Sequence, residues 1–162
     1  MALAEDKRPA YLRLAREATP IMTTEDTPFE IGKAYVYAPG SDVTIISTGT
    51  MTYQAMDAAH RLYLQGIDAE VVHVPTIKPL DAVTILKSVQ KTKRVITVEE
   101  AQINGGLGGA IAELLSEEFP VPLKRIGMKD RFGESGSPGE LLEHFGLTAK
   151  HIMLAAHSIV DR

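Results

Sequence analysis

Hydrophobic and polar residues follow two alternating patterns along most of the chain: short apolar runs, and longer stretches with apolar residues three or four positions apart. The first pattern is typical of buried strands, and the second of helices with one buried side. Strands are predicted over residues 33–38, 43–47, 69–74, 94–98 and 123–126. Helices are predicted over residues 52–65, 80–91, 108–118 and 138–145, with a last one that Thr148 caps and that ends near residue 160.

The residues at the predicted helix ends support these boundaries. Pro79 and Asp81 stand at the start of the 80–91 helix, where a missing N–H and a negative charge are both favourable. Gly66 and Gly146 follow two of the helices and suit a left-handed stop. Because strands alternate with helices, we predict an α/β fold with a mostly parallel sheet covered on both faces.

The first thirty residues do not continue this alternation. Residues 1–7 have the pattern of a helix end, and Tyr11–Leu14 has the pattern of a strand with no neighbouring sheet. Residues 18–28 contain two prolines and four threonines, which is a linker composition. We therefore expect the opening strand to belong to a sheet elsewhere, and the chain to be a piece, or the end, of a longer polypeptide.

Composition narrows the functional classes. A length of 162 residues fits one domain, and a formal net charge of -4 gives no electrostatic reason to expect nucleic acid or a membrane as partner. The absence of cysteine excludes disulfides, thiolate nucleophiles and cysteine metal sites. No apolar run approaches the roughly 18 residues that span a bilayer. A cytoplasmic protein is the expectation.

A glycine cluster lies between the 94–98 strand and the next helix, where phosphates often bind. Its spacing matches neither the dinucleotide fingerprint nor the phosphate loop of nucleotide triphosphatases. A tight turn with close packing of helix against strand is therefore the favoured interpretation. The cluster consists of Gly105, Gly106, Gly108 and Gly109.

Two adjacent carboxylates, Glu99 and Glu100, end the strand before that cluster. Open α/β sheets bind ligands at this carboxyl edge, and paired carboxylates can share a proton or hold a metal. Capping of the next helix, or contact with a partner subunit, is the commoner role. Ser47–Thr50, after another strand, could bind an anion or simply cap a helix.

The histidines have no zinc spacing such as HExxH. His73 falls in a strand and is predicted to be a hydrogen-bonded core residue, whereas His60 and His144 are predicted on helix surfaces. The remaining two, His151 and His157, are six positions apart on the last helix and do not share a face.

Arg16 follows the opening strand and has no apolar surroundings to explain it. A guanidinium at a strand end can clamp a phosphate with two hydrogen bonds, although a surface arginine is the commoner outcome.

Four segments, in order along nearly the whole chain, resemble one family. The segments IKPLD (77–81), VEE (98–100, followed by Gly105 and Gly106) and KDRFGESG (129–136) are similar to the C-terminal domain of transketolases. The segment RPAYLRLAR (8–16) resembles the last strand of the pyrimidine-binding domain that precedes it in that family.

The resemblance implies a three-layer α/β/α domain with a five-stranded mixed sheet, in which we assign the antiparallel strand to residues 33–38. It also implies three regions: 1–17 as the terminal piece of the pyrimidine-binding domain, 18–30 as linker, and 31–162 as the transketolase C-terminal domain. The resemblance also implies that Arg16 matches the family arginine that binds the phosphate of the sugar substrate.

The family reaction moves a two-carbon ketol unit between sugar phosphates with thiamine diphosphate and a divalent metal such as magnesium. Other domains of the family hold this cofactor and metal, so we expect neither in this chain and expect the chain alone to be inactive. Thiamine-binding domains or a subunit of the same enzyme, within a homo- or hetero-oligomer, are the implied partners. The alternatives are the C-terminal domain of 1-deoxy-D-xylulose-5-phosphate synthase, and a regulatory module that senses a ligand near Glu99 and the glycine turn.

Overall fold

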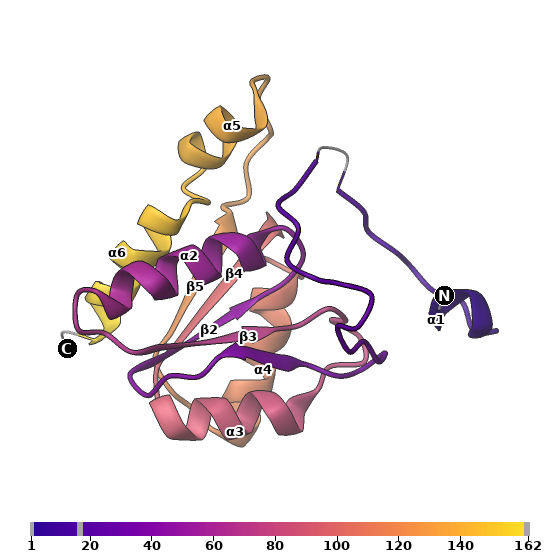
Figure 1. Cartoon of the computed structure of the whole chain (residues 1–162), viewed down its shortest axis with the longest axis horizontal. Helices are drawn as coiled ribbons and strands as arrows, with labels where there is room; N and C mark the ends of the chain where they lie inside the picture. The colour runs from indigo at the N-terminus through magenta and orange to yellow at the C-terminus, as the bar shows by residue number, and fades with distance from the viewer. Residues whose placement is uncertain (1, 16–17, 161–162) are drawn as a thin grey trace.

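Five strands form one sheet in the order β1-β3-β2-β4-β5, and helices pack on both its faces (Figure 1). The computed structural model describes residues 2–15 and 18–160. The strands are β1 (Tyr35–Ala38), β2 (Val43–Ser47), β3 (Ala69–His73), β4 (Val95–Gln102) and β5 (Leu123–Met128). The helices are α1 (Ala2–Glu5), α2 (Met51–Tyr63), α3 (Ala82–Thr92), α4 (Leu107–Glu118), α5 (Pro138–His144) and α6 (Ala149–Val160).

The sheet has the predicted mixed topology. Strands β3, β2, β4 and β5 run parallel to one another, whereas β1 runs antiparallel to β3, as the family resemblance implied for residues 33–38. Strands β1 and β2 are adjacent in sequence but do not pair. All five residues of β2 are buried, which accounts for its continuous apolar pattern.

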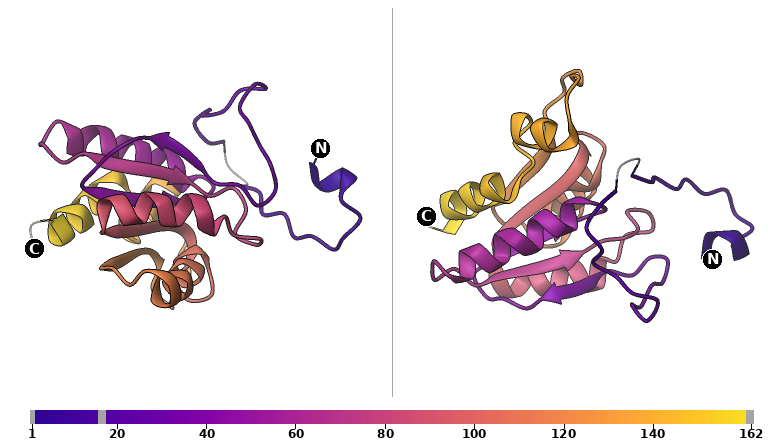
Figure 2. Two further views of the ribbon diagram at one scale, coloured as in Figure 1. Left: turned by 90° about the horizontal axis from the view of Figure 1, so that it is seen from below. Right: turned by 45° about the horizontal axis from the view of Figure 1, so that its top comes forward.

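Two hydrophobic clusters on opposite faces of the sheet make three layers. Ile45 of β2 belongs to the cluster under α2 and α6, and the next residue, Ile46, belongs to the cluster under α3 and α4. This change of face follows the two-residue period of a strand. Figure 2 shows the helix pairs on the two sides of the sheet. The predicted α/β/α architecture is confirmed.

Asp81 ties the start of α3 to the start of β1. Its carboxylate accepts hydrogen bonds from the backbone N–H groups of Thr84 (3.1 Å) and Ala34 (3.0 Å). Burial alone would raise the pKa of Asp81, but these N–H groups outweigh that effect, and the pKa is lowered. The expected helix start therefore also anchors the antiparallel strand.

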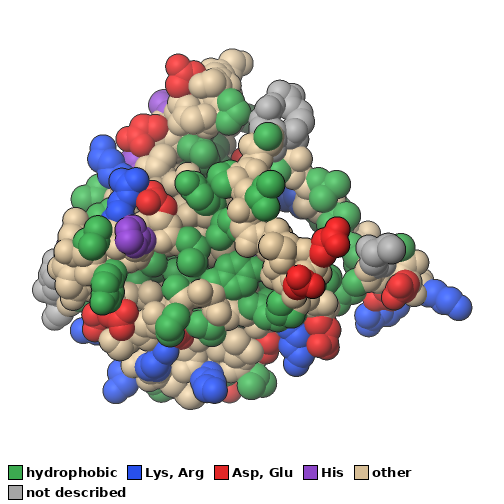
Figure 3. All heavy atoms as spheres, viewed as in Figure 1, with side chains coloured by type: hydrophobic (Ala, Val, Ile, Leu, Met, Phe, Trp, Pro, Cys, Tyr) green, Lys and Arg blue, Asp and Glu red, His purple; other side chains and the backbone are tan. Residues whose placement is uncertain are grey.

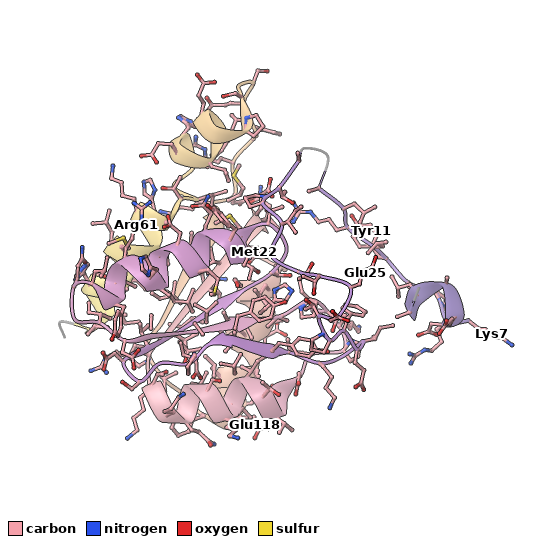
Figure 4. All side chains as sticks on the ribbon, viewed as in Figure 1. Lys7, Tyr11, Met22, Glu25, Arg61 and Glu118 are labelled. Carbon is pink, nitrogen blue, oxygen red and sulfur yellow. The ribbon has the colours of Figure 1, made fainter. Side chains whose placement is uncertain are left out.

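Whether Tyr11–Leu14 pairs with a sheet elsewhere stays a prediction, because the described residues supply no partner strand. These residues form no strand, and Tyr11, Leu12 and Leu14 are 89%, 62% and 77% exposed. A strand needs a neighbour for its hydrogen bonds, and among the described residues none lies beside this segment. Figure 4 shows Lys7 and Tyr11 on a segment that extends away from the sheet.

Candidate functional site

The four parallel strands end at one edge of the sheet, called here the carboxyl edge. Polar residues singled out from the sequence meet there: Ser47 ends β2, His73 ends β3, and Glu99 and Glu100 lie near the end of β4. Open α/β sheets place their ligands at this edge. The hydrogen bonds of these residues therefore decide whether the edge is free to bind one.

The Glu99 carboxylate caps α4. The side chain is buried, with 1% exposed, and its two oxygens accept hydrogen bonds from the N–H groups of Leu107 (2.8 Å) and Gly108 (2.7 Å). A carboxylate at a helix N-terminus satisfies orphan donors and faces the positive end of the helix dipole. The position that a phosphate would take at this helix is thus filled by the chain itself.

The glycines of this turn leave the space that the Glu99 carboxylate occupies. A Cβ atom on Gly106 would lie 1.9 Å from the Oε2 atom of Glu99, and one on Gly108 would lie 3.0 Å from Oε1. Gly105, with φ of +76°, makes the turn in the left-handed region that glycine tolerates best. The prediction of a tight turn with close helix–strand packing is confirmed, and so is the capping role for one glutamate of the pair.

Glu100 makes contacts of a different kind. It is exposed, its carboxylate accepts a hydrogen bond from the hydroxyl of Thr50 (2.6 Å), and its backbone carbonyl accepts one from the Arg13 guanidinium. The two adjacent carboxylates therefore serve different elements and do not act as a proton-sharing pair. Arg13 was missed by the sequence analysis, because a contact across 87 positions leaves no local signal.

A chain of hydroxyls connects β2 to His73. The Ser47 hydroxyl donates to Thr52 Oγ1 (3.1 Å), which is bonded to Nδ1 of His73 (2.8 Å). The His73 and Tyr37 rings lie 5.0 Å apart between centroids. Burial lowers the pKa of His73 and raises the pKa of Tyr37. His73 is hydrogen-bonded as predicted, but it is half-buried at the edge of the sheet and not in the core.

The other predicted positions make no metal centre. Within the described part of the chain, no three histidine, aspartate or glutamate side chains come together as metal ligands. His60 and His144 are exposed on helices, as expected. Arg16 lies outside the described residues, so its phosphate contact stays a prediction. Among the described helices, none has the length and apolar character needed to cross a bilayer.

Apolar side chains are exposed around the carboxyl edge. Ile77 follows β3 and Phe132 follows β5, with 37% and 96% of the side chain exposed. Ile21 (94%) and Phe29 (55%) lie in the segment that leads into β1, whose antiparallel direction makes it start at this edge. Figure 3 shows hydrophobic side chains gathered over the centre of one face, between the projecting α5 and the N-terminal segment. With its polar groups engaged internally, the edge presents a surface suited to docking.

Comparison with known proteins decides the family. The family model described as the C-terminal domain of transketolase matches residues 32–152. The chain belongs to the transketolase C-terminal domain family. A 6-deoxy-6-sulfo-D-fructose transketolase subunit of Clostridium sp. (strain MSTE9) is 48% identical over 154 residues, covering 95% of this chain and 48% of the relative.

Two further proteins are similar to this transketolase C-terminal domain. A split-gene transketolase, solved as an inactive β4 tetramer, superimposes with a TM-score of 0.95 at 42% identity, over 99% of this chain and 52% of that one. A 1-deoxy-D-xylulose-5-phosphate synthase of Trichormus variabilis is 43% identical over 134 residues, 82% of this chain and 21% of the relative. The chain spans about half the length of the first curated relatives that it matches.

Proposed function

We propose that the chain is the C-terminal part of a thiamine-diphosphate-dependent transketolase that transfers a two-carbon ketol unit between sugar phosphates, and that it is inactive by itself. The observation that carries this proposal is the carboxyl edge. Its carboxylates and hydroxyls bond to the chain's own backbone and side chains, while Ile77 and Phe132 are exposed beside them. Such an edge supports assembly with another domain.

The described residues do not fit the cofactor. Thiamine diphosphate carries a diphosphate and a bound metal, which need amide donors and oxygen ligands. The N-terminus of α4 is capped by Glu99, and no group of metal ligands is present among the described residues. The cofactor is therefore assigned to thiamine-binding domains or a subunit of the same enzyme. The proposed assembly is a homo- or hetero-oligomer, and its proposed location is the cytoplasm. The region boundaries at residues 17 and 30 are part of this proposal.

The transketolase assignment is supported over its alternatives. The transketolase subunit from Clostridium matches more of this chain, and at higher identity, than the Trichormus deoxyxylulose-phosphate synthase does. The alternative of a ligand-sensing module at Glu99 and the glycine turn loses its site, because the Glu99 carboxylate fills it.

The enzyme reconstituted from this chain and its thiamine-binding part should accept xylulose 5-phosphate with ribose 5-phosphate. It should form little or no product from pyruvate with glyceraldehyde 3-phosphate. A coupled assay with each substrate pair makes the comparison, and the thiamine-binding part alone serves as the control. Preference for the pyruvate pair would replace transketolase with deoxyxylulose-phosphate synthase.

We assign to Arg16 the recognition of the anionic group of the sugar. A guanidinium binds phosphate through two parallel hydrogen bonds, and the sulfo group in the name of the Clostridium relative's substrate is likewise an anion that it can bind. Arg16→Ala in the complete enzyme should raise KM for phosphorylated sugars by roughly 10- to 100-fold, the effect of one or two charge-assisted hydrogen bonds. Unphosphorylated acceptors should keep their KM. Equal changes for both classes of substrate would remove the role, and Arg8→Ala in the same segment is the matched control.

A further inference from the structure

A groove with a basic lining runs between the outer edge of β5 and α6. It encloses a cavity of about 310 Å³ and is called here the β5 groove. The side chains that matter for its chemistry are Lys124, Lys129, Phe145, His151 and Leu154. Its volume lies at the small end of the range for ligand sites, about 300–1,000 Å³. The groove lies along the side of the sheet and contains none of the residues discussed at the carboxyl edge.

Lysine side chains dominate the charge of the residues that line the β5 groove. No acidic side chain is among the described residues that line it, although the whole chain carries a net charge of -4. Lys124 is half-buried, and neither it nor Lys129 forms an ion pair with any described residue. The larger cavity, of about 650 Å³, differs because its lysine, Lys91, is paired with Glu70.

His151 is oriented so that its second nitrogen remains available. The Thr148 hydroxyl donates to the Glu143 carboxylate (3.1 Å) and must therefore accept from Nδ1–H of His151 (2.8 Å). In the neutral ring this leaves Nε2 without a proton. Nε2 is therefore a hydrogen-bond acceptor, and it can pair with the P–OH group of a singly protonated phosphate.

The backbone of β5 adds further donors. Val95 N–H bonds to the carbonyl of Pro122 (3.0 Å). In a parallel ladder this register turns the backbone N–H and C=O groups of Lys124 and Ile126 toward β4. The N–H groups of Arg125 and Gly127, which alternate with these two residues, therefore face the outer side, where no described strand pairs with β5. The Arg125 side chain packs beside Gly108 of α4, on the other face of the sheet, and its guanidinium donates to the carbonyl of Ile103 (2.9 Å), so Arg125 contributes its backbone to the groove and not its charge.

The opposite wall is apolar. Phe145 and Leu154 line it, and the Leu154 side chain is 59% exposed. We propose that the β5 groove binds a small phosphorylated molecule, with the phosphate near Lys124, Lys129 and His151 and an apolar portion against Phe145 and Leu154. This proposal is independent of the transketolase assignment, because the groove is complete within this chain.

Phenyl phosphate is the probe that tests both halves of the β5 groove. In a ¹H–¹⁵N NMR titration of the 162-residue chain, the shifts should move at residues 124–129, 146 and 151–158. Phenyl phosphate should bind about tenfold more tightly than inorganic phosphate because its ring is removed from water. Phenol should not saturate. Shift changes centred elsewhere would overturn the proposal, as would equal affinities for phenyl phosphate and inorganic phosphate.

Paired substitutions separate a specific site from general charge attraction. Lys124→Ala with Lys129→Ala should lower the affinity for phenyl phosphate at least tenfold. Lys33→Ala with Lys87→Ala, two exposed lysines elsewhere, removes the same charge and should leave it unchanged. Equal losses in both double variants would mean an adventitious ion only. If the melting temperature of the first double variant differs from that of the unmodified chain, Lys129→Ala alone must show the loss, since Lys129 is exposed and outside the core.

Discussion

Alanine at position 106 is expected to lower the free energy of unfolding by about 4 kcal/mol, the sum of overpacking and of a broken buried hydrogen-bond pair. The new Cβ would lie 1.9 Å from the Glu99 Oε2 atom and 2.7 Å from the carbonyl oxygen of Gln102. The Gln102 carbonyl is part of the backbone and cannot easily give way. The Glu99 side chain would therefore have to move to make room for the new methyl group. A displaced carboxylate would leave the N–H groups of Leu107 and Gly108 without their acceptor inside the protein.

Gly109→Ala is the matched control for this prediction. Gly109 lies in the same turn, within α4, and a Cβ there would meet no atom within 4 Å. Because alanine is the better helix former, Gly109→Ala should raise stability by roughly 0.5–1 kcal/mol. Urea denaturation of both variants provides the measurement. Similar stabilities for Gly106→Ala and Gly109→Ala would show that the turn does not depend on the buried carboxylate.

Periodicity predicted the regular elements well, because burial on both faces leaves a strong sequence signal. The five strands and the helices from α2 onward are found close to the predicted positions. Strand β4 runs to Gln102 instead of residue 98, since a register shift lets Gln102 pair with Met128 beyond the apolar run. Polar residues at a strand end carry no apolar pattern, so that extension had no signal.

Local pattern could not predict which glutamate caps α4. Strand alternation places Glu99 and Glu100 on opposite faces, but the face that meets α4 depends on the tertiary packing. The Tyr11–Leu14 segment shows a related dependence on tertiary context. Its pattern favours a strand, but strand formation depends on a neighbour that the described residues do not supply.

Aspartate substitutions at the carboxyl edge should weaken assembly with the thiamine-binding part more than an aspartate substitution elsewhere on the surface. Ile77 and Phe132 extend from two connections that end at this edge, and together they present an apolar contact without a described partner. Burying two carboxylates against a docked domain costs several kcal/mol, so Ile77→Asp with Phe132→Asp should weaken assembly at least 100-fold. Leu64→Asp, at 73% exposed and at the opposite end of α2, should have little effect.

Calorimetric titration of thiamine diphosphate, with magnesium present, tests the central claim most directly. The account predicts no saturable heat with this chain alone, and stoichiometric binding once it is combined with the separately produced thiamine-binding part. In that mixture the Ile77→Asp, Phe132→Asp variant should need at least 100 times more chain for half-maximal transketolase activity. Saturable cofactor binding by the chain alone would contradict the account, and so would a variant that assembles as well as Leu64→Asp.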